Sequence, residues 1–336
     1  MTLQCCVAPR THSKANGQIT PLKPVFMTVH DLGCNHYQYE DFVGNSNMLP
    51  IMQRAAWIHL DLPGQGDGDT ELPSNYVFPP INKLPDAMKE VLDHFKVKQV
   101  ILFGEGAGAN ILARFAMSFD EMVLGAILIH CTGASASFAE SIKDKLVNWK
   151  LNISGMNTAT ESFLIMHRFG PLVGAENEVE LKNAIETFRQ NLRHSINPKN
   201  LNKFIAAYMQ RKNLNDNLSK LKCPVLFIAG SLSSQRRACR QLYEDLMRAQ
   251  KDKGGSSISR EYFEIDGVAN VITERPEKVV SSMQYFLQGL GLLSNLKLQK
   301  TPMSLNRRMS MQDYDRPLGK MHFVSRLSQQ LTEEAD

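Results

Sequence analysis

The chain has 336 residues, of which 43% are hydrophobic and 21% are charged, a composition typical of a globular protein of one large or two smaller domains. Its formal net charge is +4 and no stripe of Lys and Arg alternates with aromatic residues, which argues against a nucleic acid as partner. No apolar run approaches the ~20 residues that a membrane span needs, and residues 1–10 lack the basic-then-apolar order of a secretory signal. These features predict a cytoplasmic protein.

The cysteines are not spaced as metal ligands. The sequence contains no C-x-x-C pair and no Cys–His spacing typical of zinc sites. We therefore predict reduced thiols, no metal and no cofactor. The six cysteines are Cys5, Cys6, Cys34, Cys131, Cys223 and Cys239.

In chain order, residues 1–23 are polar with scattered Pro and Gly, which predicts an irregular segment. Short apolar runs then predict strands, and segments with apolar residues at helical spacing predict the helices between them. Alternating strands and helices imply a mostly parallel sheet with helices on both faces, an α/β domain over residues 24–293. The strands are expected at residues 24–29, 56–60, 100–103, 123–130, 224–229 and 259–265.

Residues 134–217 have no β-branched run and carry spaced apolar residues among charges, which predicts helices. A helical insertion between strands is typical of a cap over the carboxyl edge of the sheet, where ligands of open α/β sheets bind. Beyond Leu293 the apolar periodicity fades, so residues 294–336 are predicted to be a disordered tail. The cap helices are expected at residues 138–149, 159–167, 178–193 and 201–210.

The stretch 99–110 predicts a strand, a very tight turn and a helix. Its glycines fit two motifs: a dinucleotide-binding G-x-G-x-x-G/A turn through Gly104, Gly106 and Ala109, and the G-x-S-x-G nucleophile elbow of α/β-hydrolases with Gly106 in the nucleophile slot. A dinucleotide fold needs an acidic residue at the end of the next strand, ~20 residues further on, but that strand ends in His130-Cys131-Thr132. The hydrolase motif is therefore the favoured one.

The three triad positions that follow from this motif lack the required groups. Gly106 has no side chain, Ser231 stands where the acid is expected after a later strand, and Ala269 fills the region where the histidine is expected. A triad needs a nucleophilic oxygen or sulfur, an imidazole and a carboxylate that orients it. Three simultaneous replacements predict a protein without hydrolase activity.

Other polar residues stand near the expected pocket. A loop of the H-x-x-G type after the first strand supplies an oxyanion-hole N–H in α/β-hydrolases, and His30 to Gly33 fit this type. A purely structural, hydrogen-bonded His30 at the end of the strand is an equal alternative. A second hypothesis is therefore an enzyme that uses non-triad groups, and a third is a small-molecule sensor without turnover. The candidate pocket residues are His30, Asp31, Gly33, Glu105 and Ala107, with Cys34 and Asp61 as further polar candidates.

Four motifs resemble those of the N-myc downstream-regulated family over residues 24–293. The resemblance implies an α/β-hydrolase fold without hydrolase activity, and an adaptor or regulatory role in signal transduction, differentiation and stress response. It also implies contacts with proteins and with lipid surfaces, in the cytoplasm and peripheral to membranes. The motifs are His30-Asp31-Leu32-Gly33-Cys34-Asn35-His36, Asp61-Leu62-Pro63-Gly64-Gln65-Gly66-Asp67-Gly68, Gly104-Glu105-Gly106-Ala107-Gly108-Ala109, and Asn197-Pro198-Lys199-Asn200-Leu201 with Phe204-Ile205-Ala206-Ala207-Tyr208.

Two further expectations follow from this resemblance. The segment before Pro24 looks too short and too polar for the paired N-terminal strands of the family, so that sheet edge is expected to be missing or differently built. Tails in the family are phosphorylated, and Arg307-Arg308-Met309-Ser310 resembles a basophilic kinase site. A phosphate on Ser310 would add up to about two negative charges that pair with nearby arginines.

Overall fold

The structure is a computed structural model that describes residues 4–8, 23–133, 156, 158–170, 178–251 and 258–293. Contacts divide the chain into two units, Met1–Lys297 and Leu298–Asp336, and every described residue belongs to the first. The predicted helix at residues 138–149, the tail 294–336 and Ser310 lie outside the described residues. No helix of the described part is long and apolar enough to cross a membrane.

A seven-stranded sheet organises the described residues. Its strand order is β1-β3-β2-β4-β5-β6-β7, and every neighbouring pair is parallel except β1 with β3. The central strands β2, β4 and β6 are buried along their whole length, which explains their continuous apolar sequences. The strands are β1 Gln4–Ala8, β2 Val25–Val29, β3 Ala56–Asp61, β4 Val100–Glu105, β5 Val123–Ile129, β6 Val225–Gly230 and β7 Arg260–Ile265.

The expectations of an irregular segment and of a missing sheet edge were wrong at Gln4–Ala8, whereas a differently built edge, the other alternative, is compatible with the structure. These residues form strand β1, which pairs antiparallel with β3 from Gln4 opposite Asp61 to Ala8 opposite Trp57. The pairing satisfies backbone groups along the outer edge of β3. Among the described residues before Pro24, the sheet edge is thus formed by the five-residue strand β1.

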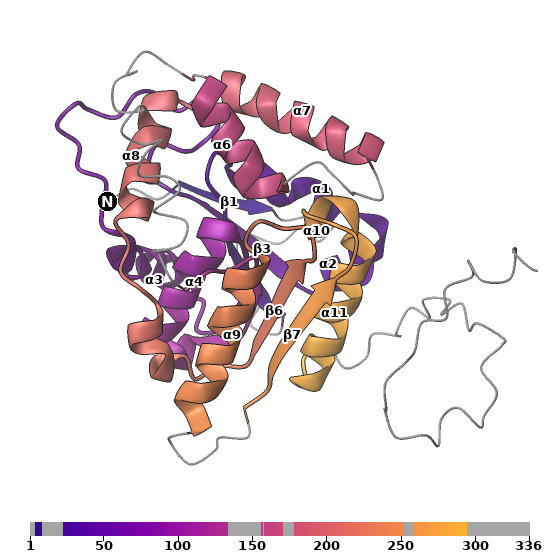
Figure 1. Cartoon of the computed structure of the whole chain (residues 1–336). Helices are drawn as coiled ribbons and strands as arrows, with labels where there is room; N and C mark the ends of the chain where they lie inside the picture. The colour runs from indigo at the N-terminus through magenta and orange to yellow at the C-terminus, as the bar shows by residue number, and fades with distance from the viewer. Residues whose placement is uncertain are drawn as a thin grey trace, which may run out of the picture. The chain divides into compact units, whose positions relative to one another are not determined.

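Helices cover both faces of the sheet and create two hydrophobic cores (Figure 1). Successive residues of a strand face opposite sides, so Met27 packs in the core under α3, α4 and α9, whereas Phe26 packs in the core under α11. The helices on the first side are α3 Leu84–His94, α4 Gly106–Ser118 and α9 Arg236–Lys251; on the second are α1 Glu40–Gly44, α2 Leu49–Met52, α10 Val271–Glu274 and α11 Pro276–Gly289. Short 3₁₀ helices connect the elements at η1 His36–Tyr39, η2 Ser46–Met48, η3 Ile81–Lys83, η4 Asp120–Met122 and η5 Asn215–Lys220.

Three helices form the described part of the cap: α6 Thr158–Phe169, α7 Glu178–His194 and α8 Pro198–Met209. In Figure 1 the arrows of β6 and β7 point toward this group, so the cap lies over the carboxyl ends of the strands. Helices were predicted at these three places. Residues from α6 and α7 join the same core as the sheet, including the buried Leu164, Leu181 and Leu192.

The Asn-Pro-x-Asn-Leu block begins α8 and ties a loop to it. Asn197 accepts hydrogen bonds from the N–H groups of Lys199 and Asn200, and Pro198 occupies the first turn, where its missing N–H costs nothing. Asn200 is fully buried. Its Oδ1 accepts from the Leu72 N–H at 2.8 Å and its Nδ2 donates to the Thr70 carbonyl at 2.9 Å.

Replacing Asn200 with alanine is expected to lower the free energy of unfolding by about 2 kcal/mol, because two hydrogen bonds are lost and a partly buried N–H keeps no acceptor. Urea unfolding followed by circular dichroism measures this change. The matched control is Asn202→Ala, at a half-exposed position on the same helix. Equal effects of the two substitutions would show that the loop contact carries no stability.

His59 on β3 is a buried histidine in an aromatic layer. Its Nδ1 lies 2.8 Å from the Thr28 hydroxyl, and its ring stacks at 6.0 Å from Trp57 and 6.4 Å from Tyr39. Burial, with the neighbouring His36 adding to it, lowers the pKa of His59 to about 4. The unfolded chain therefore binds a proton at a higher pH than the folded protein does.

As pH falls from 6.5 to 4, the unfolded state gains a proton on His59 that the folded state rejects, so stability declines over that interval by about 3 kcal/mol from this group. Unfolding free energies measured across that range for the natural protein and His59→Gln should show a shallower slope in the variant. His94→Gln, at an exposed position, should leave the slope unchanged; an unchanged slope in His59→Gln would contradict the prediction.

Candidate active site

The turn between β4 and α4 has the geometry of a nucleophile elbow. Every residue of β4 is buried, α4 starts directly at Gly106, and Gly106 has φ +57°, the left-handed conformation that strains other residues. Gly108 allows α4 to approach β2, because a Cβ there would lie 1.9 Å from the Val29 carbonyl oxygen. The glycines thus serve a sharp turn and close packing.

The Asp31 carboxylate fills the space that a nucleophile's side chain would need. An ideal Cβ on Gly106 would lie 2.3 Å from Asp31 Oδ2. Asp31 Oδ1 accepts from the Ala107 N–H at 2.7 Å. In α/β-hydrolases the N–H of the residue after the nucleophile belongs to the oxyanion hole, so in this chain that donor binds the protein's own carboxylate.

Asp31 is held as an anion. It is 1% exposed, and burial alone would raise its pKa. The nearby His167, the Ala107 N–H and the Arg168 cation outweigh burial, so the pKa of Asp31 is below its ordinary value of 3.8. The site therefore contains a buried negative charge at neutral pH.

The cap supplies the second partner of this carboxylate. His167, on α6, places Nε2 at 3.0 and 3.1 Å from the two Asp31 oxygens. Gln235 donates its Nε2 to the His167 carbonyl at 3.0 Å and lies 3.2 Å from His167 Nδ1. Since an amide nitrogen only donates, this contact favours a proton on Nε2, directed at Asp31.

Glu105, the last residue of β4, is the centre of a second buried cluster. Its carboxylate accepts from Gln38 Nε2 at 2.8 Å and from Asn270 Nδ2 at 3.0 Å. His130 Nδ1 lies 3.4 Å from it and Arg168 Nη2 lies 3.8 Å from it. Gln38 also joins the two clusters, because its Oε1 accepts from the Asp31 N–H at 2.7 Å.

The loop after β2 was expected to offer a backbone N–H to an oxyanion hole. The Asp31 N–H instead donates to Gln38, and it is the Asp31 carboxylate that enters the site. His30 Nδ1 lies 2.9 Å from the Asp31 carbonyl, and His30 Nε2 accepts from the Leu62 N–H at 3.1 Å. Burial lowers the pKa of His30, so its neutral ring braces the loop. Asp61 belongs elsewhere: its two oxygens lie 2.6 Å from the N–H and from Nδ1 of His36.

The other two triad positions have structural contacts. Ser231 donates its hydroxyl to Asp266 Oδ1 at 2.9 Å and accepts from the Gly267 N–H at 2.9 Å, which ties the loops after β6 and β7 together. Ala269 is fully buried, and its N–H donates to Glu274 Oε1 at 2.9 Å. In the described part of the chain, no group of three or more His, Cys, Asp or Glu side chains has metal-binding geometry.

The structure thus brings Asp31, Glu105 and Ala107 together, with His30 beside them, while Gly33 lies at the edge of a neighbouring cavity. Sequence reasoning missed the partners from elsewhere in the chain, because a His-Arg pair in a helical segment and isolated amides follow no recognisable spacing. These partners are Gln38, His167, Arg168, Gln235 and Asn270.

The model of the Ndr family matches residues 11–294. The chain is 31% identical over 297 residues to the uncharacterized protein ZK1073.1 of Caenorhabditis elegans, covering 88% of this chain and 85% of that protein. It is 28% identical to protein NDRG3 of Xenopus tropicalis, covering 85% of this chain and 72% of the relative.

Among solved structures, a thermophilic esterase from Thermogutta terrifontis is similar with a TM-score of 0.64 and 16% identity, covering 86% of this chain and 93% of the esterase. MenH from S. aureus is similar with a TM-score of 0.63 and 16% identity, covering 86% of this chain and 98% of MenH. These likenesses confirm the predicted α/β-hydrolase fold. The family model and the 31%-identical relative establish that the chain belongs to the Ndr family, as its motifs indicated.

Proposed function

We propose that this protein is a non-catalytic α/β-hydrolase-fold protein that acts by binding, as a cytoplasmic adaptor or regulator in signal transduction, differentiation and stress response. The observation that supports the non-catalytic part most strongly is the Asp31 carboxylate over Gly106, bonded to the Ala107 N–H. The regulatory role is what family membership implies.

The buried carboxylate opposes ester hydrolysis in two ways. Gly106 has no group that can attack a carbonyl carbon. In addition, the Asp31 carboxylate occupies the Ala107 N–H and would repel the oxyanion that such a reaction forms there. Loss of one oxyanion donor alone lowers the rate by about 10²–10³-fold.

The same groups are better suited to hold the cap on the sheet. Asp31 comes from the loop after β2, His167 from α6 and Gln235 from the turn before α9, and all three are buried. A buried hydrogen-bonded network of this kind fixes one arrangement of its elements. In this proposal the former reaction centre positions the cap, whose outer surface is available to partners.

A non-triad enzyme is the weaker alternative. The carboxylates of Asp31 and Glu105 are 1% exposed and already accept hydrogen bonds, so neither is placed to take a proton from a substrate. Binding of a small molecule without turnover is a second candidate function, and the cavity into which Arg168 extends favours it.

Two experiments test the proposal. A fluorophosphonate probe, which labels activated serines, should give no adduct by intact-mass analysis under conditions that label an active α/β-hydrolase completely; a stoichiometric adduct would contradict the non-catalytic part.

Proximity labelling in cells with the full chain, with Ser310→Ala and with residues 294–336 removed should give a reproducible set of protein or membrane partners. A set identical to that of an unrelated α/β-hydrolase would contradict the adaptor role.

A further inference from the structure

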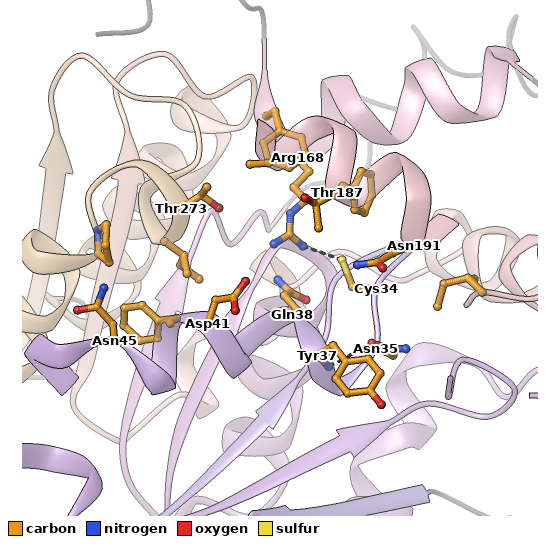
Figure 2. Close-up of a pocket in the computed structure, with 18 residues that line it drawn as sticks. Cys34, Asn35, Tyr37, Gln38, Asp41, Asn45, Arg168, Thr187, Asn191 and Thr273 are labelled. Atoms are coloured by element: carbon orange, nitrogen blue, oxygen red, sulfur yellow. Dashed lines mark hydrogen bonds between the residues drawn. The ribbon is translucent and has the colours of Figure 1, made fainter. Parts of the chain in front are cut away.

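A cavity of about 330 Å³ lies beside the Asp31 network, under the cap. The described residues that enclose it come from the segment 33–45, from α6 and α7, and from the α10–α11 region. Figure 2 shows that Arg168 extends into this cavity, with Gln38 and Cys34 near its guanidinium group and Thr187 and Asn191 from α7 close by. The cavity does not include Asp31 or Gly106 among its described lining residues.

Arg168 is a buried cation with few hydrogen-bond acceptors among the described residues. Its side chain is 8% exposed. Nη1 donates to the Cys34 sulfur at 2.6 Å, Nη2 lies 3.8 Å from Glu105 Oε2, which is beyond hydrogen-bond distance, and Nε has no acceptor among the described residues. A guanidinium group has five N–H donors, and a buried arginine normally uses them.

Neither Cys34 nor Glu105 supplies the missing acceptors. Burial raises the pKa of Cys34 to about 12, so its sulfur is a neutral thiol and a weak acceptor. The Glu105 carboxylate already accepts from the amides of Gln38 and Asn270. Surrounding negative groups, against the effect of burial, hold the pKa of Arg168 above its ordinary value, so the cation persists.

The rest of the cavity has apolar walls and a polar mouth. The Phe169 and Phe188 ring centres each lie 5.5 Å from the Arg168 guanidinium carbon. Phe42, Ile196 and Ile272 add buried apolar surface. At the mouth the side chains are exposed and polar, and the acidic one is Asp41.

We propose that this cavity binds a small organic anion whose head group pairs with Arg168 and whose apolar body lies along Phe169, Phe188 and Phe42. Two oxygens of one carboxylate or phosphate match the planar fork of a guanidinium group. Because Asp41 at the mouth disfavours further negative charge, a singly charged carboxylate fits better than a dianionic phosphate. This inference adds a ligand site to the binding role proposed above, and it does not depend on whether that role includes protein partners.

Isothermal titration calorimetry of the full chain tests the proposal with three matched probes: phenylacetate, phenyl phosphate and the neutral phenylacetamide. We expect phenylacetate to bind about 10–100-fold more tightly than phenylacetamide, the range for a charge-assisted hydrogen-bonded pair. Tighter binding of phenyl phosphate than of phenylacetate would support the anion site and assign it to phosphate heads. Absence of binding by both anions, or equal binding of the neutral amide, would overturn the proposal.

Variants locate the site. Thr187→Trp, at an exposed mouth position, should fill the cavity and abolish binding, whereas Gln190→Trp, exposed on the same helix but outside the cavity, should leave it unchanged. Arg168→Gln should lower anion affinity to that of the amide, with its folding checked by circular dichroism. Retained anion binding in folded Thr187→Trp would overturn the assignment of the anion site to this cavity. Because Thr187 is exposed, this substitution leaves the buried contacts of Arg168 and Glu105 intact.

Discussion

Replacing Gly106 with serine is expected to destabilise the folded protein by about 3–5 kcal/mol rather than restore a nucleophile. The new Cβ would lie 2.3 Å from Asp31 Oδ2, on a residue whose φ of +57° strains any side chain. To admit the serine, the carboxylate must leave the Ala107 N–H and His167, and both would then lose their charged acceptor.

Urea unfolding measures this loss, and a double-mutant cycle identifies its cause. Asp31→Ala removes the obstructing carboxylate, so Gly106→Ser should cost less in that background, with a coupling of about 1–3 kcal/mol. The matched control is Gly289→Ala, in α11, where a Cβ meets nothing within 4 Å; it should stabilise by about 0.5–1 kcal/mol. Additive effects of the two site substitutions would contradict the steric account.

Replacing Asp31 with alanine is expected to lower the free energy of unfolding by about 3–5 kcal/mol. The substitution breaks a buried charge-assisted network, and the two donors directed at the carboxylate keep no acceptor. The Ala107 N–H and His167 Nε2 are those donors. Asp41→Ala, which removes an exposed carboxylate, should change stability by less than about 0.5 kcal/mol.

The stabilisation by the Asp31 carboxylate depends on pH. Because the pKa of Asp31 is lower in the folded protein than its ordinary 3.8, its contribution is fully present above the unfolded-state pKa and is lost as pH falls through the folded value. The stability difference between the natural protein and Asp31→Ala should therefore stay constant from neutral pH to about pH 5 and shrink only below about pH 4. A difference that vanishes near pH 6 would contradict the assignment to this carboxylate.

Chemical rescue separates the lost anion from a general loss of packing. Formate, compared with chloride at equal ionic strength, should raise the melting temperature of Asp31→Ala more than that of the natural protein, since a ligand that binds only the folded state stabilises it. Equal shifts in the two proteins would mean that the site in the variant does not accept an anion.

Local sequence patterns account for most of the fold. The apolar run and the glycine spacing around Gly106 predict the strand, the turn and the helix that β4 and α4 form, because both signals come from adjacent residues. The cap helices α6, α7 and α8 were predicted for the same reason. Strand β1 was missed, since its short sequence Gln-Cys-Cys-Val-Ala has neither polar alternation nor turn residues to mark it.

The site was only partly predictable because its decisive contacts are tertiary. The empty nucleophile slot at Gly106 is visible in the sequence, but the carboxylate that fills it is not. Asp31 and His167 are 136 residues apart, and no local periodicity relates them. Likewise, the importance of Arg168 depends on its burial between Phe169 and Phe188, a property of the packed cap rather than of the residue type.

Hydrolysis of short 4-nitrophenyl esters by the purified full chain decides whether the Asp31–His167 network is the structural network proposed here or part of a working reaction centre. We expect no turnover above that of a matched inert protein, in the natural chain and in His167→Gln alike. Ester turnover by the natural protein that disappears in folded His167→Gln or Asp31→Asn would contradict it.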